Sequence, residues 1–212
     1  MKKYNIDGYK NLKAIIFDFD DTLYMQRNKE ENYLNFTITT LCNILNMDRA
    51  SAVKFLEGYD FFDISKRPRL TTIIKSLGEE YEEKYNQYRI DNFYMPNLED
   101  VEVVPNSELQ KLKSKYLLFL VTGEYLQNLQ KKADAMGIDL SLFDSIRVGD
   151  IKTKKEKVTI YQELLNEYNL DAKNVIAIGD RFVVDIEPLI KLGGGGVLIS
   201  NTTEVVSIIN EL

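Results

Sequence analysis

Three aspartates follow a short apolar run near the start of the chain. The run 14–17 (Ala-Ile-Ile-Phe) leads directly into Asp18, Asp20 and Asp21. Carboxylates clustered behind apolar residues are costly unless a cation or hydrogen bonds satisfy them. A divalent cation would offset their charge and let a phosphate approach. Aspartate is also common in turns, so this segment alone leaves an ordinary turn after a strand as the alternative.

Two later apolar runs, 116–121 and 175–178, each lead into residues that could contact a phosphate or a cation. The polar residues that follow them are Thr122, Gly123, Asp180 and Asp185. Taken alone, Thr122 could equally cap a helix, and Asp185 could merely begin one, because acidic side chains are favoured in the first helical turn. If the runs are parallel strands, their carboxyl ends meet at one sheet edge and these groups lie beside the first aspartates.

A group of four lysines could supply positive charge to the same edge. Lys152, Lys154, Lys155 and Lys157 lie between the second and third apolar runs. A charge run is usually a solvated surface, and we expect this of at least three of them. One lysine that reached the site would balance the carboxylates and hold a phosphoryl oxygen.

The composition excludes several other kinds of chemistry. The 212-residue chain has no histidine, so neither a Ser-His-Asp triad nor a Cys-His pair can form. Cys42 is the only cysteine, which excludes an intrachain disulfide and a cysteine-based zinc site and fits a reducing cytoplasm. A formal charge of −6 without a basic stripe argues against nucleic acid as a partner. Nothing approaches the ~20 apolar residues of a membrane span, so we expect a cytoplasmic protein with no membrane partner.

The pattern around these residues predicts the elements that position them. The apolar runs are bounded by turn signals, as strands buried on both faces of a parallel sheet are, and 197–199 is a weaker fourth candidate. Helical spacing separates the runs at 107–113, 124–136, 157–168 and 185–192. The alternation predicts an α/β fold with a doubly wound, Rossmann-like parallel sheet. Gly193–Gly196 precede a strand and open no helix, so we interpret them as a flexible turn and not as a phosphate loop.

One long segment departs from this alternation. Helical patterns follow one another with no buried strand between them, at 30–46, 48–59, 69–77 and 79–93. We therefore expect an all-helical domain, 25–97, inserted after the first strand of a catalytic core formed by 1–24 and 98–212. Pro96 and Pro105 interrupt regular structure and mark the return to the core.

In their order along the chain, these residues resemble the haloacid dehalogenase superfamily. The segment 18–22 (Asp-Phe-Asp-Asp-Thr) resembles its first motif, Thr122 its second, a lysine its third, and Gly179-Asp180 with Asp185 its fourth. Within the first motif, Asp21 stands where glycine is frequent. The resemblance spans the core from about Lys13 to Ser200, and four motifs in the right order are more specific than any one. The helical insertion resembles the C1 cap of that superfamily.

The resemblance implies an activity as well as a fold. It implies a phosphatase in which Asp18 attacks phosphorus and Asp20 acts as general acid and base. Mg²⁺ would be held by Asp18, the backbone carbonyl of Asp20 and Asp180, with Asp185 supporting it through water. The residues that would contact the phosphoryl group are Thr122, Gly123 and Lys155.

The choice of Lys155 depends on a count along the chain. Counting back from Asp180 through the predicted helix places Lys155 where the family usually has its third-motif lysine. The common Lys-Pro pair is absent here. Lys154 and Lys157 therefore stay possible, and Lys152 is a poorer candidate.

The expected substrate is a small phosphorylated metabolite, because a C1 cap that closes over the site favours small molecules over phosphoproteins. Sugar phosphates, nucleotides and phosphoglycolate are the classes we consider. Lys66, Arg67 and Arg69 could meet an anionic substrate, although surface charge is the commoner role of such residues. The sequence leaves open whether the protein is a monomer or a homodimer.

Other activities fit the same residues less well. A phosphomutase shares every core residue and stays possible, whereas Asp20 argues against dehalogenase chemistry. The spacing of Asp18 and Asp20 and the long helical insertion argue against a phosphoacceptor module similar to receiver domains. The intact motifs argue against a protein that only binds its ligand.

We predict that Asp18→Asn removes turnover and leaves the fold intact, because it deletes the nucleophile and a metal ligand without adding bulk. Asp20→Asn should lose nearly as much, since acid/base catalysis contributes ~10²–10⁴-fold. Release of inorganic phosphate measures both, with circular dichroism as the control for folding. An Asp20→Asn variant with near wild-type turnover would contradict the role assigned to Asp20.

Overall fold

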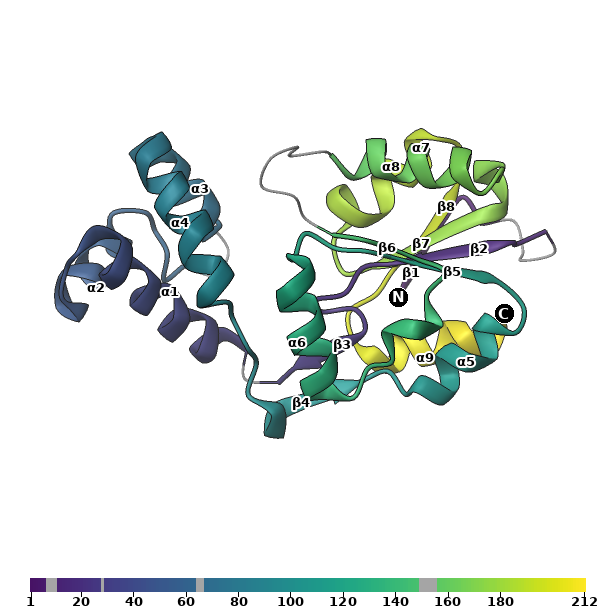
Figure 1. The fold of residues 1–212 in the computed structure, drawn as a ribbon, viewed down its shortest axis with the longest axis horizontal. Helices are drawn as coiled ribbons and strands as arrows, with labels where there is room; N and C mark the ends of the chain where they lie inside the picture. The colour runs from purple at the N-terminus through teal and green to yellow at the C-terminus, as the bar shows by residue number, and fades with distance from the viewer. Residues whose placement is uncertain (7–10, 28, 64–66, 149–155) are drawn as a thin grey trace. The chain divides into compact units, whose positions relative to one another are not determined.

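The structure is a computed structural model that describes residues 1–6, 11–27, 29–63, 67–148 and 156–212 (Figure 1). It divides into two compact units. The first consists of Met1–Arg27 and Leu98–Leu212, and the second of Asn28–Asn97. Among the described helices, none combines the length and the apolar character that crossing a membrane requires.

A six-stranded sheet forms the centre of the first unit. Its strand order is β1 (Lys2–Tyr4), β8 (Gly195–Leu198), β7 (Val175–Gly179), β2 (Ala14–Phe17), β5 (Leu117–Val121) and β6 (Ser145–Arg147). β1 pairs with β8 in antiparallel orientation, and every other neighbouring pair is parallel. The three central strands are almost wholly buried, which is why they read as continuous apolar runs in the sequence.

The register of the three central strands sets the position of the polar residues. Phe17 of β2 lies opposite Leu120 of β5 and Ile178 of β7. Asp18 is therefore level with the last residues of the neighbouring strands, Val121 and Gly179. The polar residues that follow all three strands consequently meet at the carboxyl edge of the sheet.

Helices cover both faces of this sheet, as Figure 1 shows. The helices on one face are α5 (Asn106–Lys113), α6 (Leu126–Met136) and α9 (Thr202–Glu211), and those on the other are α7 (Lys157–Glu167) and α8 (Glu187–Lys191). Alternate residues of β2 pack against them: Ile15 and Phe17 against the first group, Ala14 and Ile16 against the second. Burying one Ile or Phe side chain in this way stabilises a fold by ~1.5–3 kcal/mol.

The prediction of a doubly wound α/β sheet with inserted helices is confirmed. The predicted helix 185–192 differs in detail, because it is a π-helical turn (Phe182–Ile186) followed by α8. The short strands β1 and β6 have no counterpart among the predicted strands. Short 3₁₀ turns at Leu98–Asp100, Leu140–Leu142 and Ala172–Asn174 complete the first unit.

A small antiparallel pair stands where the chain leaves the core and returns to it. β3 (Tyr24–Gln26) pairs with β4 (Val101–Val103), so that Gln26 lies opposite Val101. The backbone N–H of Arg27 donates to the carbonyl of Asp100 and extends the pair by one further hydrogen bond. Because this pairing ties residues 25–27 to the first unit, the second unit begins at Asn28, not at residue 25 as expected.

The second unit is helical and has a core of its own. Its helices are α1 (Lys29–Leu45), α2 (Arg49–Glu57), α3 (Leu70–Leu77) and α4 (Glu79–Asp91). The buried residues Leu41, Leu56, Phe61, Ile73 and Tyr85 come from all four helices and the α2–α3 connection, and they pack together. This unit therefore has the helical content and the separate core expected of a C1 cap.

Arg67, which the sequence offers as a contact for an anionic substrate, is used within the second unit. Its Nε donates to the carbonyl of Phe61 at 2.7 Å, and its guanidinium lies 5.0 Å from the centre of the Phe61 ring. The same guanidinium forms an ion pair with Glu30. These contacts give Arg67 a role in the helical packing, while Lys66 lies outside the described residues.

The expectation that Gly193–Gly196 form only a flexible turn is wrong, because β8 begins at Gly195. Gly193 has a φ of 94°, a left-handed conformation that suits a turn, but Gly195 and Gly196 are buried residues of β8. A Cβ atom on Gly196 would lie 2.5 Å from Cγ2 of Ile186. Gly196 is therefore required for close packing between β8 and the π-helical turn, and the run provides strand as well as turn.

Candidate metal and phosphoryl site

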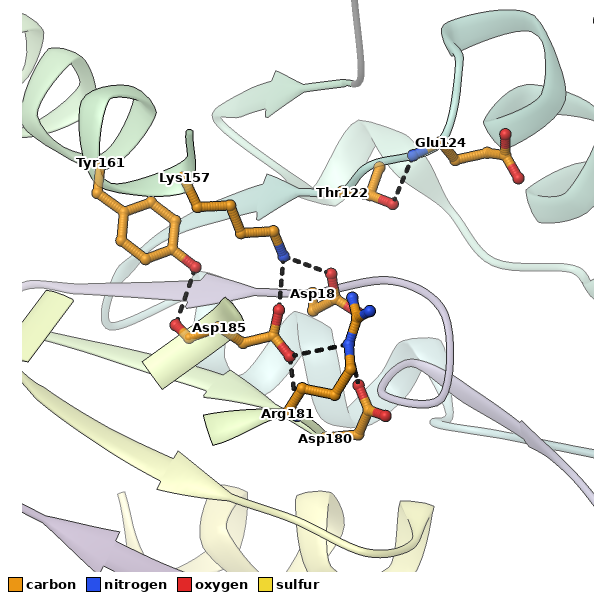
Figure 2. A network of polar contacts seen from close by, with 8 residues as sticks. All are labelled: Asp18, Thr122, Glu124, Lys157, Tyr161, Asp180, Arg181 and Asp185. Atoms are coloured by element: carbon orange, nitrogen blue, oxygen red, sulfur yellow. Dashed lines mark hydrogen bonds and ion pairs between the residues drawn. The ribbon is translucent and has the colours of Figure 1, made fainter. Parts of the chain in front are cut away.

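Asp18 is the buried centre of the carboxyl edge. Its backbone N–H donates to the carbonyl of Ile178 at 3.0 Å and so extends the pairing of β2 with β7. Its Oδ1 accepts a hydrogen bond from Nζ of Lys157 at 2.6 Å (Figure 2). Its Oδ2 is buried and has no hydrogen-bond partner within the described part of the chain. Lys157 therefore holds Oδ1 of Asp18, and Oδ2 is available to a ligand.

Burial dominates the electrostatics of Asp18. It raises the pKa of the Asp18 carboxyl from 3.8 to about 7, against the opposing effect of Lys157 and with a further raising effect from Asp185. The lysine next to Asp18 thus does not compensate fully for the loss of water and the nearby carboxylate. More positive charge at this edge would favour the ionised form.

Three carboxylates converge on this edge from two strand ends. Asp18 follows β2, Asp180 follows β7, and Asp185 lies in the π-helical turn after it. One oxygen of each lies within 4.8 Å of the others. Hard carboxylate oxygens at such spacing suit Mg²⁺, and the buried Oδ2 of Asp18 offers a ligand atom. The residues present therefore fit a divalent cation.

Both carboxylate oxygens of Asp185 accept hydrogen bonds from described residues. Its Oδ1 accepts from Nζ of Lys157 at 2.7 Å and its Oδ2 accepts from the backbone N–H of Arg181 at 2.9 Å. Its backbone carbonyl accepts from the hydroxyl of Tyr161 at 3.0 Å (Figure 2). Because both carboxylate oxygens already accept hydrogen bonds, Asp185 is better placed to support a metal ion indirectly than to coordinate it directly.

Gly179 allows Asp185 to approach the end of β7. A Cβ atom on Gly179 would lie 2.4 Å from Cβ and 2.8 Å from Oδ2 of Asp185. Contacts this short cannot be accommodated without moving either the strand or the carboxylate. The glycine before Asp180 is thus a steric requirement of the acidic cluster.

Lys157 is the lysine that the described residues bring to the carboxylates. It is the first residue of α7, and its Nζ lies between Asp18 and Asp185. Burial lowers the pKa of Lys157, but the two carboxylates together raise it above its ordinary value, which keeps the side chain charged. Lys152, Lys154 and Lys155 lie outside the described residues. The assignment of Lys155 therefore stays a prediction.

Thr122 and Gly123 follow β5 at the same edge. The Thr122 side chain is buried, and its Oγ1 accepts from the backbone N–H of Glu124 at 3.1 Å. The N-cap of α6 is Tyr125, so Thr122 does not itself cap that helix. The hydroxyl proton of Thr122 can be donated to another acceptor. A Cβ on Gly123 would meet no described atom within 4 Å, so the backbone there is open to a ligand.

Asp20 lies in a polar cluster with Tyr24, Glu124 and Lys132, three residues that were not predicted from the sequence. Its Oδ1 accepts from the hydroxyl of Tyr24 and from Nζ of Lys132, the latter at 2.8 Å. The same Nζ donates to Oε2 of Glu124 at 2.9 Å. Glu124, two residues before α6, and Asn128 and Lys132 within it recur every four residues. This spacing is the sequence signal that could have revealed the buried polar stripe.

Asp21 departs from the common motif without disturbing the turn. Its φ is 59°, in the left-handed region that glycine adopts freely. Aspartate adopts this region more readily than most other residues do. The substitution of aspartate where glycine is frequent is therefore compatible with the local backbone.

Comparison with known proteins agrees with this arrangement. A family model described as haloacid dehalogenase-like hydrolase matches residues 12–193. No curated protein has a significant sequence match to the chain.

Solved structures share the fold at low sequence identity. A haloacid dehalogenase-like hydrolase from Streptococcus pneumoniae is 19% identical with a TM-score of 0.60, over 94% of this chain and 91% of that one. A predicted phosphoglycolate phosphatase from Haemophilus somnus is 19% identical with a TM-score of 0.58, over 95% and 99%. The putative hydrolase YfnB from Bacillus subtilis, solved bound to magnesium, is 17% identical with a TM-score of 0.58, over 95% and 100%.

We predict that Gly179→Ala destabilises the fold by ~1–3 kcal/mol, as overpacking of a close contact does. It should also weaken Mg²⁺ binding, because the added methyl group displaces Asp185. Urea denaturation and isothermal titration calorimetry measure the two effects. Gly123→Ala, where the added methyl has open space, is the control for stability. Unchanged stability and Mg²⁺ affinity in Gly179→Ala would contradict the steric role of Gly179.

Proposed function

This chain belongs to the haloacid dehalogenase-like hydrolase family, and we propose that it is a Mg²⁺-dependent phosphatase acting on a small phosphorylated metabolite. One observation carries the proposal. Asp18 is buried at the carboxyl edge of the sheet beside Asp180 and Asp185, and one of its oxygens has no hydrogen-bond partner among the described residues. Such a carboxylate can serve as ligand and nucleophile in one place.

We assign the Mg²⁺ ligands to the side chains of Asp18 and Asp180 and to the backbone carbonyl of Asp20. Asp185 would support the ion through water, which agrees with the two hydrogen bonds that already engage its carboxylate. When bound, Mg²⁺ would offset the charge of the carboxylates and of the phosphoryl oxygens.

The chemistry proceeds in two displacements at phosphorus. Asp18 attacks the phosphorus atom, the bond from phosphorus to the leaving oxygen breaks, and an aspartyl-phosphate forms on Asp18. Asp20 donates a proton to the leaving oxygen. In the second step it accepts a proton from a water molecule whose oxygen attacks phosphorus, the bond from phosphorus to Asp18 breaks, and inorganic phosphate is released. Asp18 is buried beside Lys157, whereas Asp20 is partly exposed beside Lys132, and these different surroundings agree with separate roles for the two carboxylates.

Thr122, Gly123 and a lysine bind the phosphoryl oxygens in this proposal. Thr122 has a hydroxyl proton to donate, and the backbone at Gly123 is open to a ligand. Lys157 is our choice for the lysine, because its Nζ is 2.6 Å from the nucleophilic carboxylate. Fixed positive charge next to the transferring group is the main requirement of phosphoryl transfer.

The substrate class follows from the family and from the inserted helical unit. A C1-type cap favours small molecules, and we propose a sugar phosphate, a nucleotide or phosphoglycolate. The same core residues would serve a phosphomutase, so product analysis must separate the two. Release of inorganic phosphate indicates a phosphatase, whereas isomerised phosphate ester without release indicates a mutase.

We predict that phosphatase activity requires Mg²⁺ and disappears with excess chelator, because the carboxylates would otherwise repel a phosphate dianion. Ca²⁺ should substitute poorly, since its looser coordination disturbs in-line geometry. A screen over the three substrate classes, with and without EDTA, measures this. Asp180→Asn is the matched variant and should weaken Mg²⁺ activation. Full turnover in excess chelator would overturn the metal assignment.

We predict that Lys157→Ala lowers kcat/KM by roughly 10²–10³, the range seen when a group that stabilises the transferring charge is removed. Lys152→Ala, Lys154→Ala and Lys155→Ala, compared in the same assay, should each cost less than about tenfold if they are solvated. A large loss in Lys155→Ala with a small one in Lys157→Ala would restore the prediction made from the sequence. A large loss in none of the four variants would remove the third-motif lysine from the mechanism.

A further inference from the structure

Lys132 is a buried lysine that the proposed chemistry does not use. It lies on the inward face of α6 beside Leu129 and Ala133, and 3% of its side chain is exposed. A lysine at such a position loses its hydration, and this cost is recovered only through well-formed ion pairs. Its two partners therefore explain why the residue is tolerated there.

The two partners of Lys132 belong to different parts of the site. Its Nζ donates to Oδ1 of Asp20 at 2.8 Å and to Oε2 of Glu124 at 2.9 Å. Asp20 follows β2, and Glu124 follows the Thr122-Gly123 pair after β5. Lys132 thus joins the first and second motif segments, which are about a hundred residues apart in the chain.

Glu124 is itself fixed, so that it can hold Lys132 in place. Its Oε1 accepts from the backbone N–H of Tyr125 at 3.0 Å and from Nδ2 of Asn128 at 3.2 Å. Its own backbone N–H donates to the hydroxyl of Thr122. These hydrogen bonds hold the Glu124 carboxylate in one orientation, in which it accepts from Lys132.

Asp20 is less constrained by its surroundings than Asp18. Its side chain is 38% exposed, compared with 3% for Asp18, and it lies three residues beyond the end of β2. Lys132 and the Tyr24 hydroxyl both donate to Oδ1. Two donors on a single oxygen restrict the rotation of this partly exposed carboxyl group.

We propose that Lys132, held by Glu124, is a positioning residue that orients the Asp20 carboxyl for proton transfer to the leaving oxygen. The inference rests on the proposed function, because it assigns to Asp20 the role of general acid. The alternative is that Lys132 serves only to neutralise Glu124 inside the fold. Neutralising Glu124 needs only the bond to Oε2 of Glu124, whereas Nζ of Lys132 also donates to Oδ1 of Asp20 at 2.8 Å, so the observed geometry does more than this alternative requires.

The dependence on leaving group separates the two roles. Phenyl phosphate has a poor leaving group that needs a proton, whereas p-nitrophenyl phosphate has a good one that needs little help. The ratio kcat/KM reports transition-state stabilisation relative to free enzyme and substrate. We expect Lys132→Met to lower kcat/KM by about 10–100-fold for phenyl phosphate but less than about threefold for p-nitrophenyl phosphate.

Three variants control this measurement. Lys131→Met removes the exposed neighbouring lysine on α6 and should leave both values unchanged. Lys132→Arg keeps the charge and should recover most of the activity toward phenyl phosphate. Lys132→Met combined with Asp20→Asn should lose no more than Asp20→Asn alone, because the two residues act through one proton transfer.

Folding is controlled by a paired variant, Lys132→Met/Glu124→Gln, which leaves no buried charge alone. We expect it to fold, as followed by circular dichroism and thermal melting, and to keep the loss specific to phenyl phosphate. Recovery of wild-type kcat/KM toward phenyl phosphate in the pair would overturn the proposal. So would equal losses on both substrates, an additional loss in the Asp20→Asn background, or a failure of both methionine variants to fold.

The same experiment distinguishes this inference from the proposed function. If Asp20→Asn shows the phenyl phosphate-specific loss and Lys132→Met does not, only the positioning role of Lys132 fails. If the wild-type protein with Mg²⁺ releases phosphate from neither aryl phosphate nor any compound of the three substrate classes, or if Asp20→Asn has no effect, the proposed function fails and the inference fails with it.

Discussion

The burial of carboxylates at the edge of a parallel sheet is the constraint on which the rest of the site depends. Asp18 and Asp185 are removed from water and lie close enough to repel each other. An unpaired buried charge is too costly to persist, so positive groups must be delivered to this edge. α7 provides Lys157 to Asp18 and Asp185 on one face of the sheet, and α6 provides Lys132 to Asp20 and the buried Glu124 on the other. The helices thus complete the electrostatics of the site as well as the hydrophobic core.

The sheet determines which groups share this environment. Phe17 is aligned with Leu120 and Ile178, so the residues that follow these three strands emerge side by side. A side chain at the last residue of β7 would collide with Asp185. Gly179 has no Cβ atom, and the Asp185 side chain occupies the space where that atom would lie. The segment from Gly179 to Asp185 therefore provides both the close backbone approach and two of the three clustered carboxylates.

Much of the fold could be predicted because its signals are local. The strand Ala14–Phe17 is an unbroken apolar run, and its predicted bounds match β2. The three-residue strands β1 and β6 are too short to produce a pattern. The aspartates of the site could be predicted because each comes shortly after an apolar run that forms a strand. Lys157 was only one candidate, because a charge-rich helix start carries no marker of which lysine is N1, and counting favoured Lys155. Lys132 could not be assigned, since its link to Asp20 joins residues that are far apart in the chain.

The antiparallel pair formed by β3 and β4 has a consequence for how such chains can change over time. It fixes the exit of the chain opposite its return, with Gln26 beside Val101. Whatever lies between these strands begins and ends at neighbouring points, so the ends of the intervening segment are held together by the core, and loop length adds little entropic cost. The helices from Lys29 to Asp91 also enclose their own core. An insertion built in this way is a replaceable module: recombination could substitute another helical segment while the sheet and its acidic edge keep their geometry.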